Sequence, residues 1–303
     1  MTAAVAGPQP PVVRRRTRRN WAPVALIAPA VIVGLLIFAA PFVNAIITTF
    51  RGSRYGVLTN DYSFKSWIYI FTTDTYIDTT LRTLGFALAT MVLCILLAFP
   101  VAYYIVFRSK ISNLLTLLTV TPLLLNAVVL GMGWIIMLNS QGLVNSIYKA
   151  LSGNTVALEL LNTPGAVIVG LTFVYMPYML MTMISTLRGL DTRVIQSAQS
   201  LGATPARAFW DVTVPLSLPG VLSGAILVFS LSAGVFVIPL FLGGPRLDTL
   251  PSLAYNQALF SYNTPQALAT SFFLLVILLV IISLITRLIE GGRYKEVFRR
   301  AQV

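Results

Sequence analysis

The chain has 303 residues, of which 57% are hydrophobic and only 10% are charged. An ordinary soluble domain does not reach this balance, so the composition indicates a protein that crosses a membrane several times. Lysine and arginine outnumber aspartate and glutamate by 21 to 9. In such a chain a basic excess reflects membrane orientation, and the absence of a basic soluble domain argues against nucleic-acid binding.

Two missing residue types restrict the chemistry that this chain can perform. Histidine is absent, and Cys94 is the only cysteine. These counts exclude Ser-His-Asp and Cys-His catalysis, HExxH zinc sites and a disulfide framework. The sequence also lacks a GxxxxGK[ST] phosphate-binding loop. We therefore expect no enzyme activity, no metal site and no cofactor in this chain, with Cys94 as a small buried apolar residue.

The N-terminal part combines a basic segment with a long apolar run. Residues 1–20 carry five arginines, and the apolar run 21–50 follows. This run is longer than the apolar part of a signal peptide, and as a helix rising 1.5 Å per residue it exceeds the ~30 Å hydrocarbon core. We expect a cytoplasmic tail over residues 1–20 and a first transmembrane helix over residues 21–50.

The rest of the chain alternates polar and apolar segments. Residues 51–78 form a polar extracytoplasmic loop in which we expect one or two short surface helices around residues 63–70. Five apolar runs of about the ~20 residues that a span needs then follow, at 83–107, 114–138, 166–187, 221–242 and 267–289. Residues 290–303 form a second basic tail. The predicted fold class is an all-α integral membrane protein with six transmembrane helices.

Orientation follows from the distribution of basic residues. With the N-terminus inside, 15 of the 21 lysines and arginines lie on the cytoplasmic side, whereas the acids divide almost evenly. The positive-inside rule therefore predicts that both termini and the polar loop 190–220 are cytoplasmic. No ionisable residue falls in the central part of a predicted span. Proton- and sodium-driven carriers usually place one there, so the energy source is expected outside this chain.

The loop 190–220 has the local signals of two short helices. Asp191 or Thr192 is suited to cap the first helix, and Gly202 is suited to end it in a left-handed conformation. Four apolar residues of this helix share one face: Val194, Ile195, Ala198 and Leu201.

Thr204-Pro205 predicts the start of a second helix, which carries Phe209 and Trp210 and is expected to end before Pro215. By these signals alone the loop is either a compact two-helix docking element or an amphipathic loop in the headgroup region.

The same loop resembles the EAA motif of permease subunits of bacterial ABC importers, E-A-A-x3-G-x9-I-x-L-P. Gln196-Ser197-Ala198, Gly202 and Val212-Thr213-Val214-Pro215 match its spacing. The resemblance to the type I, MetI-like permease core covers residues 79–289. Thr121-Pro122, Asn126 and Gly133-Trp134 in the third span and Tyr175 and Pro177 in the fourth resemble spermidine/putrescine-type permeases more narrowly. Gln196 replaces the motif glutamate, and Val235 replaces an acidic residue of the fifth span. Leu130 or a neighbour replaces an arginine of the third span.

The resemblance implies the fold of a type I ABC importer permease in a bacterial inner membrane. As a permease subunit, the chain would form the translocation path together with a second permease subunit, identical or homologous. Two cytoplasmic ATPase subunits would bind ATP, and an extracytoplasmic binding protein would deliver a polyamine or a related small solute. An alternative is a self-contained six-helix secondary transporter or channel, which predicts transport without an ATPase.

The resemblance assigns residues to one site, and the polarity of the spans indicates a second. Those of the ATPase-coupling loop are Gln196, Ser197, Ala198, Gly202, Ala203, Pro205, Phe209, Val212 and Pro215. The polar and amphipathic side chains within the spans are candidates for a substrate path: Asn126, Trp134 and Tyr175. Helix packing and interfacial anchoring are the alternative roles for these three residues.

Overall fold

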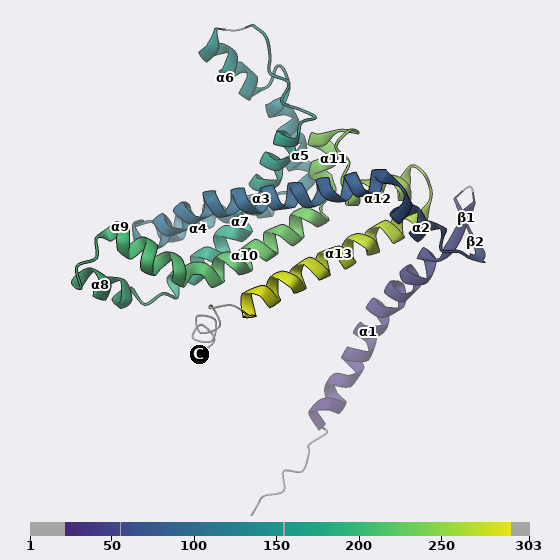
Figure 1. Ribbon diagram of the computed structural model, residues 1–303, viewed down its shortest axis with the longest axis horizontal. Helices are drawn as coiled ribbons and strands as arrows, with labels where there is room; N and C mark the ends of the chain where they lie inside the picture. The colour runs from purple at the N-terminus through teal and green to yellow at the C-terminus, as the bar shows by residue number, and fades with distance from the viewer. Residues whose placement is uncertain (1–21, 55, 154, 292–303) are drawn as a thin grey trace, which may run out of the picture. The chain divides into compact units, whose positions relative to one another are not determined.

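The computed structural model describes residues 22–54, 56–153 and 155–291 (Figure 1). The chain divides into two units, Met1–Ala45 and Ile46–Val303. Within the described residues, six helical segments are long and apolar enough to cross a membrane: Leu26–Thr49, Asp74–Phe107, Ala127–Ser152, Pro164–Arg188, Pro205–Gly234 and Thr264–Arg287. The predicted all-α architecture with six spans is confirmed. The predicted tails, residues 1–20 and 290–303, lie outside the described residues except for residues 290 and 291.

Helix α1 (Ala22–Thr49) covers the first predicted apolar run and contains Pro29 and Pro41. None of its side chains from Leu26 to Ile47 for which burial is described is buried. An apolar helix with so much exposed surface suits contact with lipid rather than with water.

The polar segment after α1 contains a small sheet that the sequence did not predict. Strands β1 (Arg51–Arg54) and β2 (Val57–Tyr62) form an antiparallel hairpin in which Arg51 pairs with Tyr62. Gly56 has a φ of 80° beside the turn, a conformation that glycine adopts without strain. The expected short helix is present as α2 (Lys65–Thr72).

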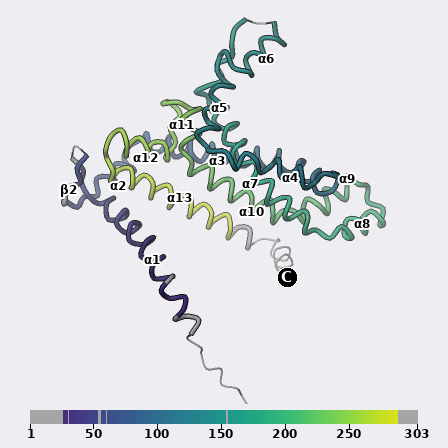
Figure 2. Tube along the Cα trace, turned by 180° about the vertical axis from the view of Figure 1, so that it is seen from behind, coloured from purple at the N-terminus to yellow at the C-terminus, as the bar shows by residue number. Residues whose placement is uncertain are grey.

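Three helices of the second unit pack side by side: α3 (Asp74–Phe107), α7 (Pro164–Arg188) and α10 (Val214–Gly234) (Figures 1 and 2). Their core includes Cys94, Met179 and Val228, which are fully buried. Small residues allow the close approach of α10 to α7, because a Cβ atom at Gly220 or Gly224 would overlap Thr186 or Thr182. Such small-residue contacts are typical of helix pairs in membranes.

The third predicted span, 114–138, is not one continuous helix. It consists of α4 (Ser112–Val120), the 3-10 helix η1 (Thr121–Leu124) and α5 (Ala127–Leu138). The chain is extended at Leu125 and Asn126, and Asn126 Oδ1 accepts a hydrogen bond of 2.8 Å from Val128 N. Asn126 therefore starts a new helix where continuity was expected.

The fifth predicted span, 221–242, is also interrupted. Helix α10 ends at Gly234, the chain is extended at Val235, and α11 (Val237–Gly243) follows. In a continuous helix, Pro239 would lack the hydrogen bond to the Val235 carbonyl and its ring would collide with that carbonyl. The break at Val235 avoids both effects.

The remaining helices are α6 (Leu143–Ser152), α8 (Thr192–Ser200), α9 (Pro205–Ala208), the π-helical turn η2 (Phe209–Thr213), α12 (Leu250–Leu259) and α13 (Thr264–Gly291). A buried polar cluster joins α3 to α12 and α13. The Tyr76 hydroxyl accepts hydrogen bonds from Gln257 Nε2 at 2.6 Å and from Gln266 Nε2 at 2.8 Å. These bonds satisfy polar groups that would otherwise be costly to bury.

Candidate functional site

Residues 190–213, between α7 and α10, form the connecting segment. Both ends of its first helix, α8, have the predicted capping residues. Asp191 Oδ1 accepts a hydrogen bond of 2.9 Å from Arg193 N at the start of α8. At its other end Gly202 has a φ of +94°, and Ala203 N donates to Ala198 O at 3.1 Å. The left-handed glycine and the hydrogen bond from Ala203 N to the carbonyl five residues earlier are the features of a Schellman motif.

The apolar face of α8 is only partly covered. Ile195 and Ala198 are half-buried, whereas Val194 is 47% exposed and Leu201 is 89% exposed. Gln196, Ser197 and the other polar residues of the helix are exposed as well. Helix α8 therefore presents both polar and apolar side chains on its open surface.

The second half of the connecting segment differs from the expected helix that ends before Pro215. Thr204 Oγ1 caps α9 by accepting from Arg207 N at 3.3 Å, with Pro205 in the first turn, as predicted. The chain then forms the π-turn η2, in which Val214 N donates to Phe209 O, and continues into α10. Pro215 lies in the first turn of α10, directly after the π-turn. Residues 214–220 thus belong to the spanning helix.

Phe209 links the connecting segment to α3. Its ring meets Phe99 edge-on with centroids 5.8 Å apart and meets Tyr103 at 5.1 Å. The neighbouring Trp210 is 66% exposed and contacts Phe209 at 5.2 Å. A displacement of the connecting segment would therefore act on the end of α3 near Phe107 through the Phe209 ring.

The nine residues predicted for this site divide into two groups. The exposed ones are Gln196, Ser197, Gly202 and Pro205, whereas the half-buried ones are Ala198, Ala203, Phe209, Val212 and Pro215. The exposed group lies on α8 and around its glycine stop, and the half-buried group attaches this surface to the bundle.

The three residues predicted for a substrate path have separate structural contacts. Trp134 meets Phe173 edge-on at 5.6 Å, and Tyr175 is 8% exposed with its ring 6.1 Å from that of Tyr178. Asn126 is exposed and caps α5. Trp134 and Tyr175 belong to the same apolar cluster, which does not include Asn126.

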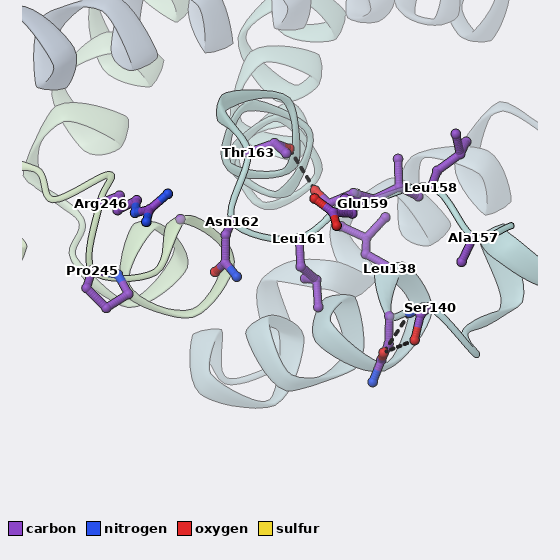
Figure 3. Close-up of a pocket in the computed structure, with 13 residues that line it drawn as sticks. Leu138, Ser140, Ala157, Leu158, Glu159, Leu161, Asn162, Thr163, Pro245 and Arg246 are labelled. Atoms are coloured by element: carbon purple, nitrogen blue, oxygen red, sulfur yellow. Dashed lines mark hydrogen bonds between the residues drawn. The ribbon is translucent and has the colours of Figure 1, made fainter.

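A cavity of about 800 Å³ that the sequence did not predict lies among three other segments (Figure 3). It is lined by the end of α5, by residues 157–163 and by the turn after α11. Figure 3 shows Glu159 and Arg246 on different walls, with Asn162 between them in this view. Asn162 N donates to Leu242 O at 2.9 Å and so joins two of these segments.

Arg82 of α3 holds the turn that carries Arg246. Its Nη1 donates to Arg246 O at 3.0 Å and to Asp248 O at 3.3 Å. Burial raises the pKa of the Asp248 carboxyl, while Ser252 and Arg82 act in the opposite direction. The Arg246 wall is therefore tied directly to α3.

Asn145 of α6 holds the wall formed by residues 157–163. It is fully buried, its Nδ2 donates to Asn139 O at 3.0 Å and to Leu158 O at 3.1 Å, and its Oδ1 accepts from Leu158 N at 2.7 Å. Nothing in the local sequence shows that Asn145 bonds to a residue thirteen positions away.

Replacing Asn145 with leucine is expected to release residues 157–163, because three backbone groups lose their partner without a change in side-chain size. The expected loss is about 2–4 kcal/mol of unfolding free energy. Limited proteolysis and thermal unfolding of the purified transporter measure it. Ser146→Ala is the matched control, because Ser146 is exposed and bonds only within its own helix, to Gly142 O at 3.0 Å. Equal protease resistance of both variants would contradict this role.

Comparison with known proteins decides the family. The family model described as "Binding-protein-dependent transport system inner membrane component" matches residues 94–291. The chain belongs to this family. It is a membrane-embedded permease subunit of an ABC importer, as predicted, and its family is one of transport proteins rather than of enzymes.

Two relatives of this permease are named after different substrates. The spermidine/putrescine permease PotB of Escherichia coli K12 is 28% identical over 204 residues, which are 67% of this chain and 74% of PotB. The molybdenum permease ModB of Mycobacterium bovis is 33% identical over 201 residues, 65% of this chain and 74% of ModB. The permease YdcU of E. coli K12 is 26% identical over 228 residues, 70% of this chain and 71% of YdcU.

Solved structures show the same permease fold. A chain of a bacterial ABC transporter that imports the polysaccharide alginate superposes with a TM-score of 0.76 at 17% identity. The match covers 91% of this permease and 97% of that chain. A chain of the methionine ABC transporter MetNI gives a TM-score of 0.54 at 16% identity, over 71% of this permease and 94% of that chain. At these identities the likeness concerns the fold alone.

Proposed function

We propose that this permease subunit imports a small ionic solute, with a polyamine as the first candidate, and that an ATPase drives it through the connecting segment. It would work with a second permease subunit, identical or homologous, and with an extracytoplasmic binding protein that delivers the solute. The family description supports the binding protein, because it names the transport systems as dependent on one. The excess of basic residues in the predicted inner segments supports cytoplasmic termini.

The open surface of α8 is the observation that carries the ATPase proposal. Val194 near the start of α8 and Leu201 just after its end leave apolar surface uncovered, and Gly202 fixes the direction in which the chain leaves the helix. A partner that covers this surface would gain from burying apolar area. Gln196 offers a neutral amide at the position of the motif glutamate, so hydrogen bonding replaces an ion pair there. The chain itself would need no cofactor, since ATP would bind to the partner.

The central parts of the predicted spans contain no acidic side chain. This permease would therefore have to recognise a polyamine by other groups. Val235 stands at the break between α10 and α11, where an acidic residue is common in polyamine-type permeases. Aromatic side chains within the spans are the candidates for contact with a cation, and the half-buried Trp134 is more accessible than the buried Tyr175. The relative PotB, named as a spermidine/putrescine permease, supports this substrate class.

The relative ModB supports an oxyanion as a second candidate substrate. Its sequence is 33% identical to this permease, whereas that of PotB is 28% identical. The neutral Val235 also favours an anion over a multivalent cation at the helix break, because no carboxylate would repel it there. A molybdate-like oxyanion is therefore the alternative substrate.

Uptake by the reconstituted transporter tests both substrate classes. Vesicles that contain this permease with its partner subunits and ATP are expected to accumulate radiolabelled putrescine or spermidine, with molybdate as the comparison. Uptake of molybdate alone would overturn the polyamine assignment. Uptake that persists without the ATPase subunits would contradict the ATPase-driven mechanism and would indicate a self-contained carrier or channel.

A further inference from the structure

A second cavity, of about 740 Å³, lies between the β1–β2 hairpin, α2, α12 and the beginning of α13. These elements occupy the same end of the helical bundle (Figures 1 and 2). Two cations line the cavity, Arg51 and Lys65, together with one carboxylate, Asp61. The formal charge of the lining is therefore one positive unit. Its other polar groups include the side chains of Ser53, Thr59, Gln257 and Asn263.

Neither cation of this cavity is neutralised by a neighbour in the part of the chain that the structure describes. Arg51 Nε is buried there without a hydrogen-bond partner. The ion pair that the described residues do form joins Arg207 to Asp211, far along the sequence in the connecting segment. Because Arg51 and Lys65 line the cavity and neither forms an ion pair with a described carboxylate, the cavity favours an anionic ligand.

The walls of the cavity are held in place by hydrogen bonds between elements. Gln266 Nε2 donates to Ser66 O at 3.3 Å and to the Tyr76 hydroxyl at 2.8 Å, which joins α13 to α2 and α3. Trp67 Nε1 donates to Thr49 Oγ1 at 3.2 Å and so ties α2 to the end of α1. The cavity therefore keeps its shape without a ligand, which reduces the entropic cost of binding one.

Aromatic and apolar residues beside the cavity indicate that it lies at the membrane boundary. The Phe50 ring meets Phe64 at 5.3 Å and Trp67 at 6.2 Å, directly after the spanning helix α1. Ile68 and Phe71 on α2 are 58% and 67% exposed. Aromatic side chains gather at headgroup depth, and exposed apolar groups are favourable there but not in water. Arg51 lies only two residues beyond the end of α1.

We infer that this cavity binds the phosphate group of a phospholipid headgroup, with Arg51 and Lys65 as its charged contacts. Phosphate is the anion that is most concentrated at this depth of a bilayer. A phosphodiester carries one negative charge, which matches the single positive charge of the lining. Asp61 would then disfavour more highly charged anions. The exposed residues of α2 would meet the acyl chains of the same leaflet.

Titration of the purified transporter with phosphatidylglycerol in mild detergent, followed by native mass spectrometry, tests this inference. The double variant Arg51→Gln/Lys65→Gln is expected to weaken retention of the lipid at least about tenfold, because two charge-assisted contacts are lost. Ser53→Glu, which keeps both cations but adds a negative charge to the cavity, is expected to weaken it as well. The control Lys149→Gln removes a cation on α6 that does not line this cavity, and it should leave retention unchanged.

Three results would overturn the inference. Equal lipid retention by the wild type and by Ser53→Glu would show that the cavity does not hold phosphate. Inorganic phosphate that binds as tightly as the lipid and displaces it would indicate a site for soluble anions. Variants that retain the lipid but lose binding of the solute-loaded binding protein would assign the cavity to protein docking.

Discussion

Replacing Gly220 with valine is expected to separate α10 from α7 and to destabilise the permease by about 3 kcal/mol or more. A Cβ atom at this position would lie 2.5 Å from Thr186 Cβ and would also overlap Thr186 Oγ1. Thr186 belongs to a packed helix and its hydroxyl donates to Thr182 O at 2.9 Å, so it has little freedom to move. Thermal unfolding of the purified transporter and the yield of assembled complex measure the effect.

Gly85→Val is the matched control for this prediction. It makes the same change in another spanning helix, α3, but a Cβ atom at Gly85 would have no neighbour within 4 Å. Its unfolding temperature is expected to stay close to that of the wild type. If Gly220→Val unfolds at the same temperature as Gly85→Val, the close approach of α7 and α10 does not limit stability.

The features that the sequence predicted correctly depend on residues close together in the chain. Asp191, Gly202 and Thr204 act within three or four positions of themselves, and each has the predicted capping or left-handed role. The six apolar runs likewise reflect a property of consecutive residues, because a span needs about 20 of them. Such local signals do not depend on how the rest of the chain packs.

The interrupted spans show where hydropathy is insufficient. Leu125 and Val235 are apolar, so the breaks at these residues leave the apolar runs unchanged. Asn126 and Pro239 are the residues that indicate the breaks. Asn126 is a good helix cap, and Pro239 disfavours a continuous helix. The rule for proline predicted a helix end before Pro215 as well, where a π-turn instead leads into α10. Proline marks a change of backbone register, but not always a helix end.

The sites depend on contacts that local sequence does not show. Phe209 contacts Phe99 and Tyr103, more than a hundred positions earlier in the chain. Arg82 holds the backbone of Arg246 and Asp248, and Asn145 holds Leu158. These partners meet only when the helices have packed, so the spacing of residues along one segment does not reveal them.

Replacing Gly202 with valine is expected to reduce transport at least about tenfold while leaving the unfolding temperature of the permease almost unchanged. Gly202 has a φ of +94°, which a β-branched residue strongly resists. A Cβ atom there would meet nothing within 4 Å, so the cost comes from the backbone and not from a collision. The exposed end of α8 can relieve it by changing direction, which would misplace the surface proposed to receive the ATPase.

Two controls separate this effect from general strain. Asparagine tolerates left-handed geometry, so Gly202→Asn is expected to retain most of the transport activity. Gly153→Val imposes similar strain at the end of α6, where φ is +67° and a Cβ atom also meets nothing, but outside the connecting segment. Copurification with the ATPase, ATP hydrolysis and solute uptake are measured for each variant. If Gly202→Val copurifies with its ATPase and transports as well as Gly202→Asn, the left-handed stop of α8 does not position the coupling surface.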